Sequence, residues 1–459
     1  MTDHPPAFLS NRLALENPWW RGAGDPDALL PRRDLFDRLF RRIHGGTGVV
    51  RLGGPRGAGK SVLVRQLVSY LLQTGLSADA VAVIPWDAPA LCGQSLDTLW
   101  AALPPAETER RLLVLDGCQH RLTAHAEADA LAALVPELCI LAVSALGGPA
   151  GADLVLPPMR FCEYLRLTGA EDAVVEPVFL GRSGRPGMYA VRDMAGLNRR
   201  FADYVAGGGF PAAVLLRHGG DGGRILRERV VDGVLRSDLP ALQGLGDSAG
   251  LTTLFVRLAG ASGQELTIEG LAADTGLAKN TVRRYLDYLE SAFLIVRMGR
   301  VHPAGERFRR MRSFKLHLTA PCLHAALFGP VGLDGPAFAA LAEGAIVGQW
   351  LGSAERERLV FCRLAEGTVD LVGLSAADDR PVWACALPGT DDSVGDRARI
   401  NGLIQFSQLN PGLRWLGATS RSTAALRAYA LDDGHTAEVW HRPAAHYCYE
   451  AGRRAAAEG

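Results

Sequence analysis

The sequence predicts an α/β protein of several domains, whose N-terminal part is a doubly wound parallel sheet. Its 459 residues correspond to about three domains at roughly one to two hundred residues each. Short apolar segments alternate with helical ones between residues 48 and 144, which is typical of parallel sheets covered on both faces. A glycine-rich segment lies between the first predicted strand and the following helix.

The composition places the chain among ordinary globular proteins. Hydrophobic residues make up 48% and charged residues 21%, which argues against wholesale disorder and against a membrane protein. Lys plus Arg and Asp plus Glu are both 49, so the overall charge indicates no partner. None of the eight cysteines forms a C-x-x-C pair, the spacing of zinc ribbons and redox motifs. The N-terminus has no basic start followed by an apolar run, and we expect a cytoplasmic protein without membrane association.

The first domain is expected over residues 31–167, after an N-terminal segment of residues 1–30. In LLPRRDLFDRLFRRIHGG, residues Leu35, Leu39 and Ile43 have helical spacing, and a glycine pair ends the helix. The helix after the glycine-rich segment is VLVRQLVSYLLQTG. The predicted strands are GVVRLGG, AVAVIPWD, RRLLVLDG and CILAVSA.

Residues 54–61, GPRGAGKS, match the pattern G-x-x-x-x-G-K-[ST] in full and in the expected strand-loop-helix context. Glycines let backbone N–H groups turn toward phosphates, and the helix N-terminus adds a partial positive charge. Lys60 is expected to reach the β- and γ-phosphates and Ser61 to ligate Mg²⁺. We therefore predict a P-loop that binds ATP, or another purine triphosphate, with Mg²⁺. The predicted binding residues are Gly54, Gly57, Ala58, Gly59, Lys60, Ser61 and Val62.

The run Leu112–Asp116 predicts a buried strand that ends in a carboxylate. Asp116 is expected to hold the Mg²⁺ shell through water, although an ordinary core strand can also end in Asp. Most ATPases of this class place Glu directly after this Asp to activate water, but here Gly117 follows.

Three further residues are catalytic candidates. Gln119 could orient a water molecule, and Asp87, after AVAVIPW, could act as a base or could merely cap its strand. Ser144, at the end of CILAVS, stands where a γ-phosphate sensor is often found, but Ser at a strand end also suits a turn. Both interpretations of Asp87 and Ser144 stay open.

Three domains are expected after the first. Residues 168–245 predict a helical lid, interrupted at the glycines and Pro211 of FADYVAGGGFPAAVLL. Residues 246–313 predict a winged helix, with a turn at Gly276 between two helices. Residues 314–459 predict an α/β domain with a helix around Ala339–Leu351 and the strands RLVFCRL, TVDLVGL and PVWACAL.

The predicted winged helix is basic. Residues 267–315 contain ten Lys or Arg against five Asp or Glu, a net charge of +5. Lys279, Asn280, Arg283 and Arg284 begin the second helix, where a recognition helix would contact DNA, and RFRRMRSFK could hold phosphates. The alternative is a structural connector whose arginines form a solvated face or contact a neighbouring subunit.

Several segments together resemble a prokaryotic group of AAA+ ATPases. They are LLPRRDLFDRLFRRI, the P-loop, LLVLDGCQ, LPPMRFCEYLRL, GGGFPAAV, VLRSDLPAL and the helix-turn-helix, in that order from Pro31 to about Leu374. The resemblance implies an ATPase core, a winged helix and a C-terminal domain of unknown function with a restriction-endonuclease-like fold.

The sequence departs from this family's pattern at functional positions. Gly117 replaces the Glu after Asp116, and Ala152-Asp153 replaces a G-R pair that could supply an arginine finger. In the C-terminal domain, Gly348 stands where an acidic residue is usual, and TVDLVGL retains only Asp370 of an E-x-D pattern. Ala384 and Ala386 occupy the positions of an E-x-K pattern.

A nuclease of this fold needs two or three carboxylates and a Lys, so we expect a degenerate domain without phosphodiester cleavage. The chain is expected to act as a nucleotide-dependent switch with weak or partner-dependent hydrolysis. A DNA-binding regulator with a mainly structural nucleotide site, and a protein-interaction scaffold, are the alternatives. Its expected partners are ATP, DNA, and either a second copy of the chain or another protein.

Overall fold

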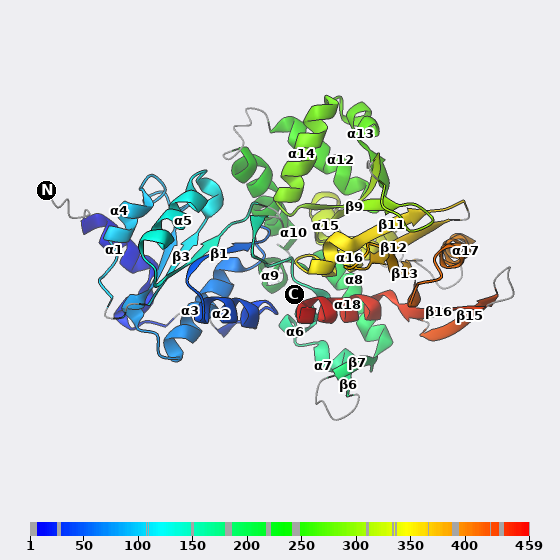
Figure 1. Ribbon diagram of the computed structural model, residues 1–459, viewed down its shortest axis with the longest axis horizontal. Coiled ribbons are helices and arrows are strands. Elements are labelled where there is room, and N and C mark those ends of the chain that lie inside the picture. Colours follow the sequence, from blue (N-terminus) through cyan, green and yellow to red (C-terminus); the bar gives the residue numbers. More distant parts are fainter. Residues whose placement is uncertain are drawn as a thin grey trace. The chain divides into compact units, whose positions relative to one another are not determined.

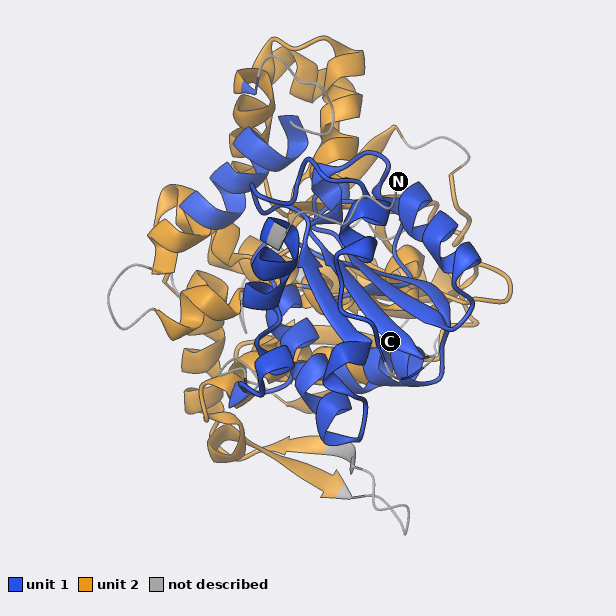
Figure 2. Ribbon diagram, turned by 90° about the vertical axis from the view of Figure 1, so that its left-hand side faces the viewer, with its two compact units in different colours: residues 1–157, 228–248, 291–293 blue, residues 158–227, 249–290, 294–459 orange. Residues whose placement is uncertain are grey.

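The computed structural model describes residues 7–24, 29–106, 108, 110–147, 151–179, 186–216, 222–240, 248–308, 312–332, 335, 337–365, 367–387, 394–422, 424–430 and 436–458. The chain forms two compact units (Figures 1 and 2). Unit 1 comprises Met1–Pro157, Glu228–Ser248 and Ser291–Phe293, and unit 2 comprises Pro158–Arg227, Ala249–Glu290 and Leu294–Gly459.

Unit 1 contains a five-stranded sheet in the order β2-β3-β4-β1-β5. Every neighbouring pair is parallel, as predicted from the alternation of apolar strands and helices. Strand β4 lies between β1 and β3, so the strand before the P-loop and the strand that ends at Asp116 are separated by the strand before Ser144. The strands are β1 Gly48–Gly53, β2 Val81–Pro85, β3 Arg111–Asp116, β4 Leu138–Val143 and β5 Leu154–Val155.

Helices cover both faces of this sheet, which confirms the doubly wound prediction. On one face, α2 (Phe36–His44) and α3 (Lys60–Gln73) pack on Leu112 and Val114. On the other, α1 (Ala7–Glu16), α4 (Leu96–Ala101) and α5 (Ala124–Leu134) pack on Leu113 and Leu115. Successive residues of β3 thus enter opposite cores, which is why its sequence is a continuous apolar run. Short 3₁₀ helices are η1 Pro18–Arg21, η3 Ala78–Ala80 and η4 Cys118–His120.

The predicted lid is largely helical, with two features that were not anticipated from the sequence. Helix α8 (Met194–Gly207) ends at the glycines and α9 (Pro211–Leu215) begins at the proline, as predicted. Strands β6 (Val175–Phe179) and β7 (Pro186–Val191) form a separate antiparallel pair. After α10 (Gly222–Ile225), the chain forms π-helical turns at Leu226–Asp232 and Val234–Asp238.

Unit 2 contains a nine-stranded sheet in the order β15-β16-β14-β13-β12-β11-β9-β10-β8. Strand β9 pairs antiparallel with β10 and parallel with β11, so strands expected in a winged helix and strands expected in a C-terminal domain share one sheet. The strands are β8 Glu265–Thr267, β9 Ile295–Val301, β10 Ser313–Leu318, β11 Leu359–Arg363, β12 Thr368–Leu374, β13 Pro381–Ala386, β14 Trp415–Ser420, β15 Ala425–Ala430 and β16 Thr436–Pro443.

The helix-turn-helix order is present in unit 2. Helix α13 (Ile268–Thr275) ends at Gly276, whose φ of 70° is left-handed, and α14 (Lys279–Ser291) follows. Its designation as a winged helix stays a prediction. The other helices are α6 Phe161–Leu167, α7 Glu171–Val174, α12 Ala249–Gly260, α15 Cys322–Phe328, α16 Phe338–Gln349, η10 Ala354–Arg358, α17 Val394–Leu409 and α18 Ala444–Glu458. No helix of the described residues is long and apolar enough to cross a membrane.

Candidate functional site

The P-loop connects β1 to α3 in unit 1, and its shape depends on glycine. Gly54 has a φ of 149°, and a Cβ there would lie 2.2 Å from the carbonyl oxygen of Leu156. Gly59 is the N-cap of α3 with a φ of 96°, a left-handed conformation that disfavours other residues. The first turn of α3 then consists of Lys60, Ser61 and Val62, so the predicted loop stands at a helix N-terminus.

Lys60 is buried and folds back over the loop. Its Nζ donates hydrogen bonds of 2.7 Å to the carbonyl oxygen of Gly54 and 3.0 Å to that of Pro55. Burial lowers the pKa of Lys60 to about 8, while the carboxylates of Asp116 and Asp238 act in the opposite direction. An ammonium held by neutral carbonyls in a desolvated site is available to a phosphate, whose charge would compensate the burial.

Ser61 and Asp116, the two predicted metal ligands, are in direct contact. Ser61 Oγ donates a 2.7 Å hydrogen bond to Asp116 Oδ2. Burial raises the pKa of the Asp116 carboxyl above its ordinary value, and the Ser61 hydrogen bond and Lys60 oppose the shift. The structure therefore brings a hydroxyl, a carboxylate and an ammonium to the start of α3.

Asp87 lies at the same edge of the sheet. Strand β2 pairs with β3 so that Pro85 is opposite Asp116, which brings the exposed Asp87 beside Gly117. A Cβ on Gly117 would lie 3.0 Å from the Cβ of Asp87, and Gly117 itself has a φ of 87°. The position after Asp116 is thus shaped for glycine.

Gln119 and Ser144 are both engaged with the backbone. Gln119 Oε1 accepts a 3.1 Å hydrogen bond from the amide of Ala145. Ser144 Oγ donates to the carbonyl oxygen of Leu146 at 2.6 Å and accepts from its amide at 3.1 Å. These bonds form a turn after β4, and the catalytic roles of Gln119 and Ser144 remain predictions.

Three charged residues that were not singled out from the sequence lie in or beside the loop. Arg33, which is buried, donates to the carbonyl oxygens of Ala58 and Pro157 and so braces the loop. Arg56, within the loop, forms a 2.7 Å ion pair with the fully buried Asp238. Arg33 belongs to the PRRD segment of the resemblance, and Asp238 to VLRSDLPAL, so both segments were noticed without a role being assigned.

These residues fit a nucleoside triphosphate with Mg²⁺. The loop amides and Lys60 would hold phosphates, and Ser61 and Asp116 would hold the metal through a hydroxyl and a carboxylate, the oxygen ligands that Mg²⁺ prefers. The metal would neutralise phosphate charge. Groups that could activate water are less complete, because Gly117 has no side chain and Gln119 is bonded to the backbone.

The predicted DNA-contacting residues lie together on α14 of unit 2. Lys279, Asn280, Arg283 and Arg284 are all exposed in the first two turns of the helix. Lys279 pairs with Glu269 at 3.3 Å, and Arg283 donates to Asn280 at 2.8 Å. Within RFRRMRSFK, residues 309–311 lie outside the described residues.

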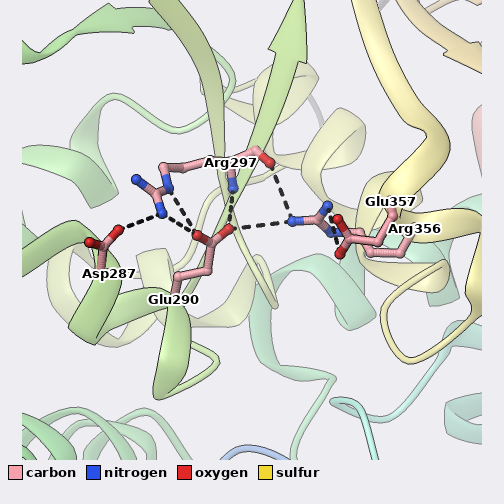
Figure 3. A network of polar contacts seen from close by, with 5 residues as sticks. All are labelled: Asp287, Glu290, Arg297, Arg356 and Glu357. Atoms are coloured by element: carbon pink, nitrogen blue, oxygen red, sulfur yellow. Dashed lines mark hydrogen bonds and ion pairs between the residues drawn. The ribbon is translucent and has the colours of Figure 1, made fainter. Parts of the chain in front are cut away.

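A polar network fixes the end of α14 to the sheet of unit 2 (Figure 3). Arg297 Nη2 on β9 lies 2.8 Å from Asp287 and 2.5 Å from Glu290, both on α14. Arg356 reaches Glu290 at 3.4 Å and also pairs with Glu357 at 3.8 Å. The acidic residues near the end of α14 are therefore paired with arginines, while the basic residues at its start are exposed.

The C-terminal part of unit 2 contains a buried charged cluster around Asp370. Lys315 Nζ on β10 lies between Glu343 on α16 and Asp370 on β12, 3.0 Å from the latter. Asp370 also accepts a 2.7 Å hydrogen bond from the amide of Leu387 and lies 3.8 Å from Arg399. Glu343 was not singled out from the sequence. Lys315 ends the RFRRMRSFK segment that was expected to hold phosphates, but it is buried between these two carboxylates, so that expectation was wrong for this residue. Among the described residues there is no group of three or more His, Cys, Asp or Glu side chains arranged to hold a metal.

One lysine serves two carboxylates in this cluster, and their pKa values diverge. Burial raises the pKa of Glu343 to about 7, although Lys315 favours its charged form. The pKa of Asp370 is lowered despite burial, because Lys315, Arg399 and the Leu387 amide stabilise its charge. The partners of Asp370 thus more than offset the effect of burial on its pKa, whereas burial remains the dominant effect on the pKa of Glu343.

Comparisons with known proteins give limited likenesses. A family model described as a domain of unknown function (DUF8612) matches residues 198–334. No curated protein matches the chain.

Among solved structures, a Walker-type ATPase of Pyrococcus abyssi is 13% identical with a TM-score of 0.39, and the match covers 65% of this chain and 96% of that one. The ORC1 protein of Aeropyrum pernix in complex with DNA is 14% identical with a TM-score of 0.32, over 66% and 93% of the two chains. Cdc6p from Pyrobaculum aerophilum is 12% identical with a TM-score of 0.25, over 70% and 95%. The assignment of a P-loop fold to unit 1 therefore depends on its own parallel sheet, its loop, and the Ser61–Asp116 contact.

Proposed function

We propose that the chain binds Mg²⁺-ATP at the start of α3 and acts as a nucleotide-dependent switch with weak or partner-dependent hydrolysis. The observation that carries the proposal is the convergence of Lys60 with the Ser61–Asp116 pair at a glycine-shaped loop. Lys60 and the loop amides hold the phosphates, and Ser61 with Asp116 holds Mg²⁺.

Slow turnover is expected because few groups near Asp116 could act as a general base. A strong general base would have to stand within hydrogen-bond reach of the attacking water. Gly117 offers no side chain, and Gln119 is bonded to the amide of Ala145. Asp87, exposed beside Gly117, is the remaining candidate base.

The test is Mg²⁺-ATP binding by the purified chain, followed by phosphate release. Lys60→Ala should abolish binding, whereas Lys279→Ala, which removes an exposed lysine of unit 2, should leave it unchanged. Binding with little Lys60-dependent turnover supports the switch. Rapid turnover that Asp87→Asn abolishes would replace the switch with an active ATPase, and equal binding by wild type and Lys60→Ala would refute the nucleotide site.

A second function, DNA binding through α14, is supported by one observation. Lys279, Arg283 and Arg284 form an exposed basic face at the start of the second helix of a helix-turn-helix. In this alternative the nucleotide site is mainly structural, and the affinity for duplex DNA is independent of nucleotide. Fluorescence anisotropy with a duplex, with and without Mg²⁺-ATP, separates the two proposals.

A further inference from the structure

Asp238 is a fully buried carboxylate beside the P-loop, on the π-helical turn Val234–Asp238 of unit 1. Its Oδ1 accepts a 2.7 Å hydrogen bond from Arg56 Nη1, and His120 Nε2 lies 3.7 Å from the same oxygen. Its Oδ2 has no hydrogen-bond partner among the described residues. Because an uncompensated buried carboxylate is costly, Asp238 depends on Arg56.

Arg56 is a residue of the P-loop itself, although it is 182 positions away from Asp238 in the sequence. Gly233 leaves room for the contact, since a Cβ on Gly233 would lie 3.0 Å from Arg56 Nε. Both residues of the pair also interact electrostatically with Lys60. Beyond the effects of burial and Asp116, Asp238 raises the pKa of Lys60 and Arg56 lowers it.

We propose that Asp238 is a latch on the nucleotide site: without nucleotide it holds the Arg56 guanidinium, and a bound triphosphate competes for that guanidinium. This inference rests on the nucleotide-binding function proposed above. Competition is expected because a carboxylate and a phosphate bind the same planar set of N–H donors. Since linkage is reciprocal, weakening the Arg56–Asp238 pair tightens triphosphate binding, and triphosphate weakens the pair.

Through the Arg56–Asp238 pair, nucleotide binding at the P-loop would change the conformation of the segment that contains Asp238. Residues 228–248 belong to unit 1, but the chain continues into unit 2 from both ends of this segment. The segment is π-helical up to Asp238, a conformation that is rare and frequent at functional sites. Release of Asp238 from Arg56 should therefore alter the protection of backbone amides in residues 228–240.

The test compares three full-length chains: wild type, Asp238→Asn and Gly233→Ala. Asp238→Asn keeps the size of the side chain and removes its charge. Gly233→Ala keeps every charge, places a Cβ 3.0 Å from Arg56 Nε so that the guanidinium must shift slightly, and has a helical φ of −59° that accepts alanine. Asp238→Asn should bind the slowly hydrolysed Mg²⁺-ATPγS about tenfold more tightly, the lower end expected for loss of one charge-assisted hydrogen bond, and Gly233→Ala should bind it more tightly by a smaller factor. Both variants should show a smaller change for Mg²⁺-ADP.

An Arg56→Gln background supplies the control for a merely structural role. There, Asp238→Asn should change the affinity for Mg²⁺-ATPγS much less than in the wild type, because the competed guanidinium is absent and only the effect of Asp238 on Lys60 remains. In hydrogen exchange, Mg²⁺-ATPγS should speed exchange in residues 228–240 of the wild type, and Asp238→Asn should show the faster exchange without nucleotide.

The outcomes separate the latch from the nucleotide site itself. Equal or weaker Mg²⁺-ATPγS binding by Gly233→Ala and by folded Asp238→Asn would overturn the latch alone. If Asp238→Asn fails to fold, Gly233→Ala and wild-type hydrogen exchange decide. If the wild type binds nucleotide no better than Lys60→Ala, the proposed nucleotide function is refuted, and the latch is refuted with it.

Discussion

Ser61 Oγ donates its hydrogen bond directly to Asp116 Oδ2 at 2.7 Å, so the hydroxyl from the start of α3 and the carboxylate from the end of β3 are already adjacent. The strand order explains how this contact forms. Strands β1 and β3 flank β4 in register, and all three have their carboxyl ends at one edge of the sheet. Ligands of open parallel sheets bind at this edge.

Removing either proposed metal ligand, Ser61 or Asp116, should affect nucleotide binding only when Mg²⁺ is present. Ser61→Ala and Asp116→Asn are each expected to weaken Mg²⁺-ATP binding about tenfold, the scale of one lost charge-assisted interaction. In EDTA, both variants should bind ATP as the wild type does, because Lys60 and the loop amides remain. Titration calorimetry with and without Mg²⁺ measures the difference, and an equal loss in EDTA would argue against a metal role.

Introducing a glutamate directly after Asp116 should not create a general base. Gly117 has a φ of 87°, and any Cβ there would lie about as close to Asp87 as atoms can approach, at 3.0 Å. Gly117→Glu is expected to destabilise unit 1 by roughly 1–3 kcal/mol and to leave phosphate release unchanged. Gly75→Ala is the matched control, because Gly75 has a φ of 105° and a Cβ there would meet nothing within 4 Å.

Thermal unfolding distinguishes the cost of backbone strain at a positive φ from the cost of the added contact with Asp87. Gly75→Ala reports the backbone strain alone, and Gly117→Ala should lower the midpoint further through the added contact with Asp87. If Gly117→Glu instead produced rapid Lys60-dependent turnover, the loop after β3 would have to be more adaptable than this packing indicates.

The sequence was sufficient for the parts of the site that are local. Residues 54–61 are contiguous, and Asp116 ends an apolar strand, so pattern and spacing predicted both. The Arg56–Asp238 pair was not predictable in this way, since its partners are 182 positions apart and meet only after the helical segment returns to the loop. No local pattern encodes such a contact.

The cluster around Asp370 illustrates the same limit. The resemblance drew attention to an E-x-K pattern at Ala384 and Ala386, where this chain has neither charged residue. The charged residues clustered with Asp370 include Lys315 from β10 and Glu343 from α16, which that pattern did not indicate. Likewise, the parallel pairing of β9 with β11 joins segments about sixty residues apart, which strand propensity cannot specify.

The buried Glu343 should make stability fall as the pH rises. Its pKa is raised from 4.5 to about 7, so the folded chain binds this proton more tightly than the unfolded chain. The corresponding stabilisation is complete below pH 4.5 and is lost as the pH rises through 7. At about 1.4 kcal/mol per pKa unit, the loss is at most roughly 3–4 kcal/mol.

Urea unfolding at several pH values between 5 and 8 measures this effect, with Glu343→Gln as the variant. The glutamine cannot titrate, so the fall in unfolding free energy across this window should be smaller than in the wild type. Asp370 titrates in the opposite sense and below its ordinary value, because its pKa is lowered, so it contributes little in this window. Identical pH profiles for the two chains would show that Glu343 stays charged.

The basic start of α14 leads to a salt-dependence prediction. If Lys279, Arg283 and Arg284 each contact a DNA phosphate, removing all three should reduce the slope of log affinity against log salt by about three. Arg199→Ala/Arg200→Ala, which removes two exposed arginines of α8, is the control and should leave the slope unchanged. Fluorescence anisotropy on a duplex from low to moderate salt gives both slopes. Because the far end of α14 is held by Arg297, the triple variant should keep the helix in place, and a change in slope then reports lost phosphate contacts. A wild type that binds no duplex at low salt would favour the structural connector.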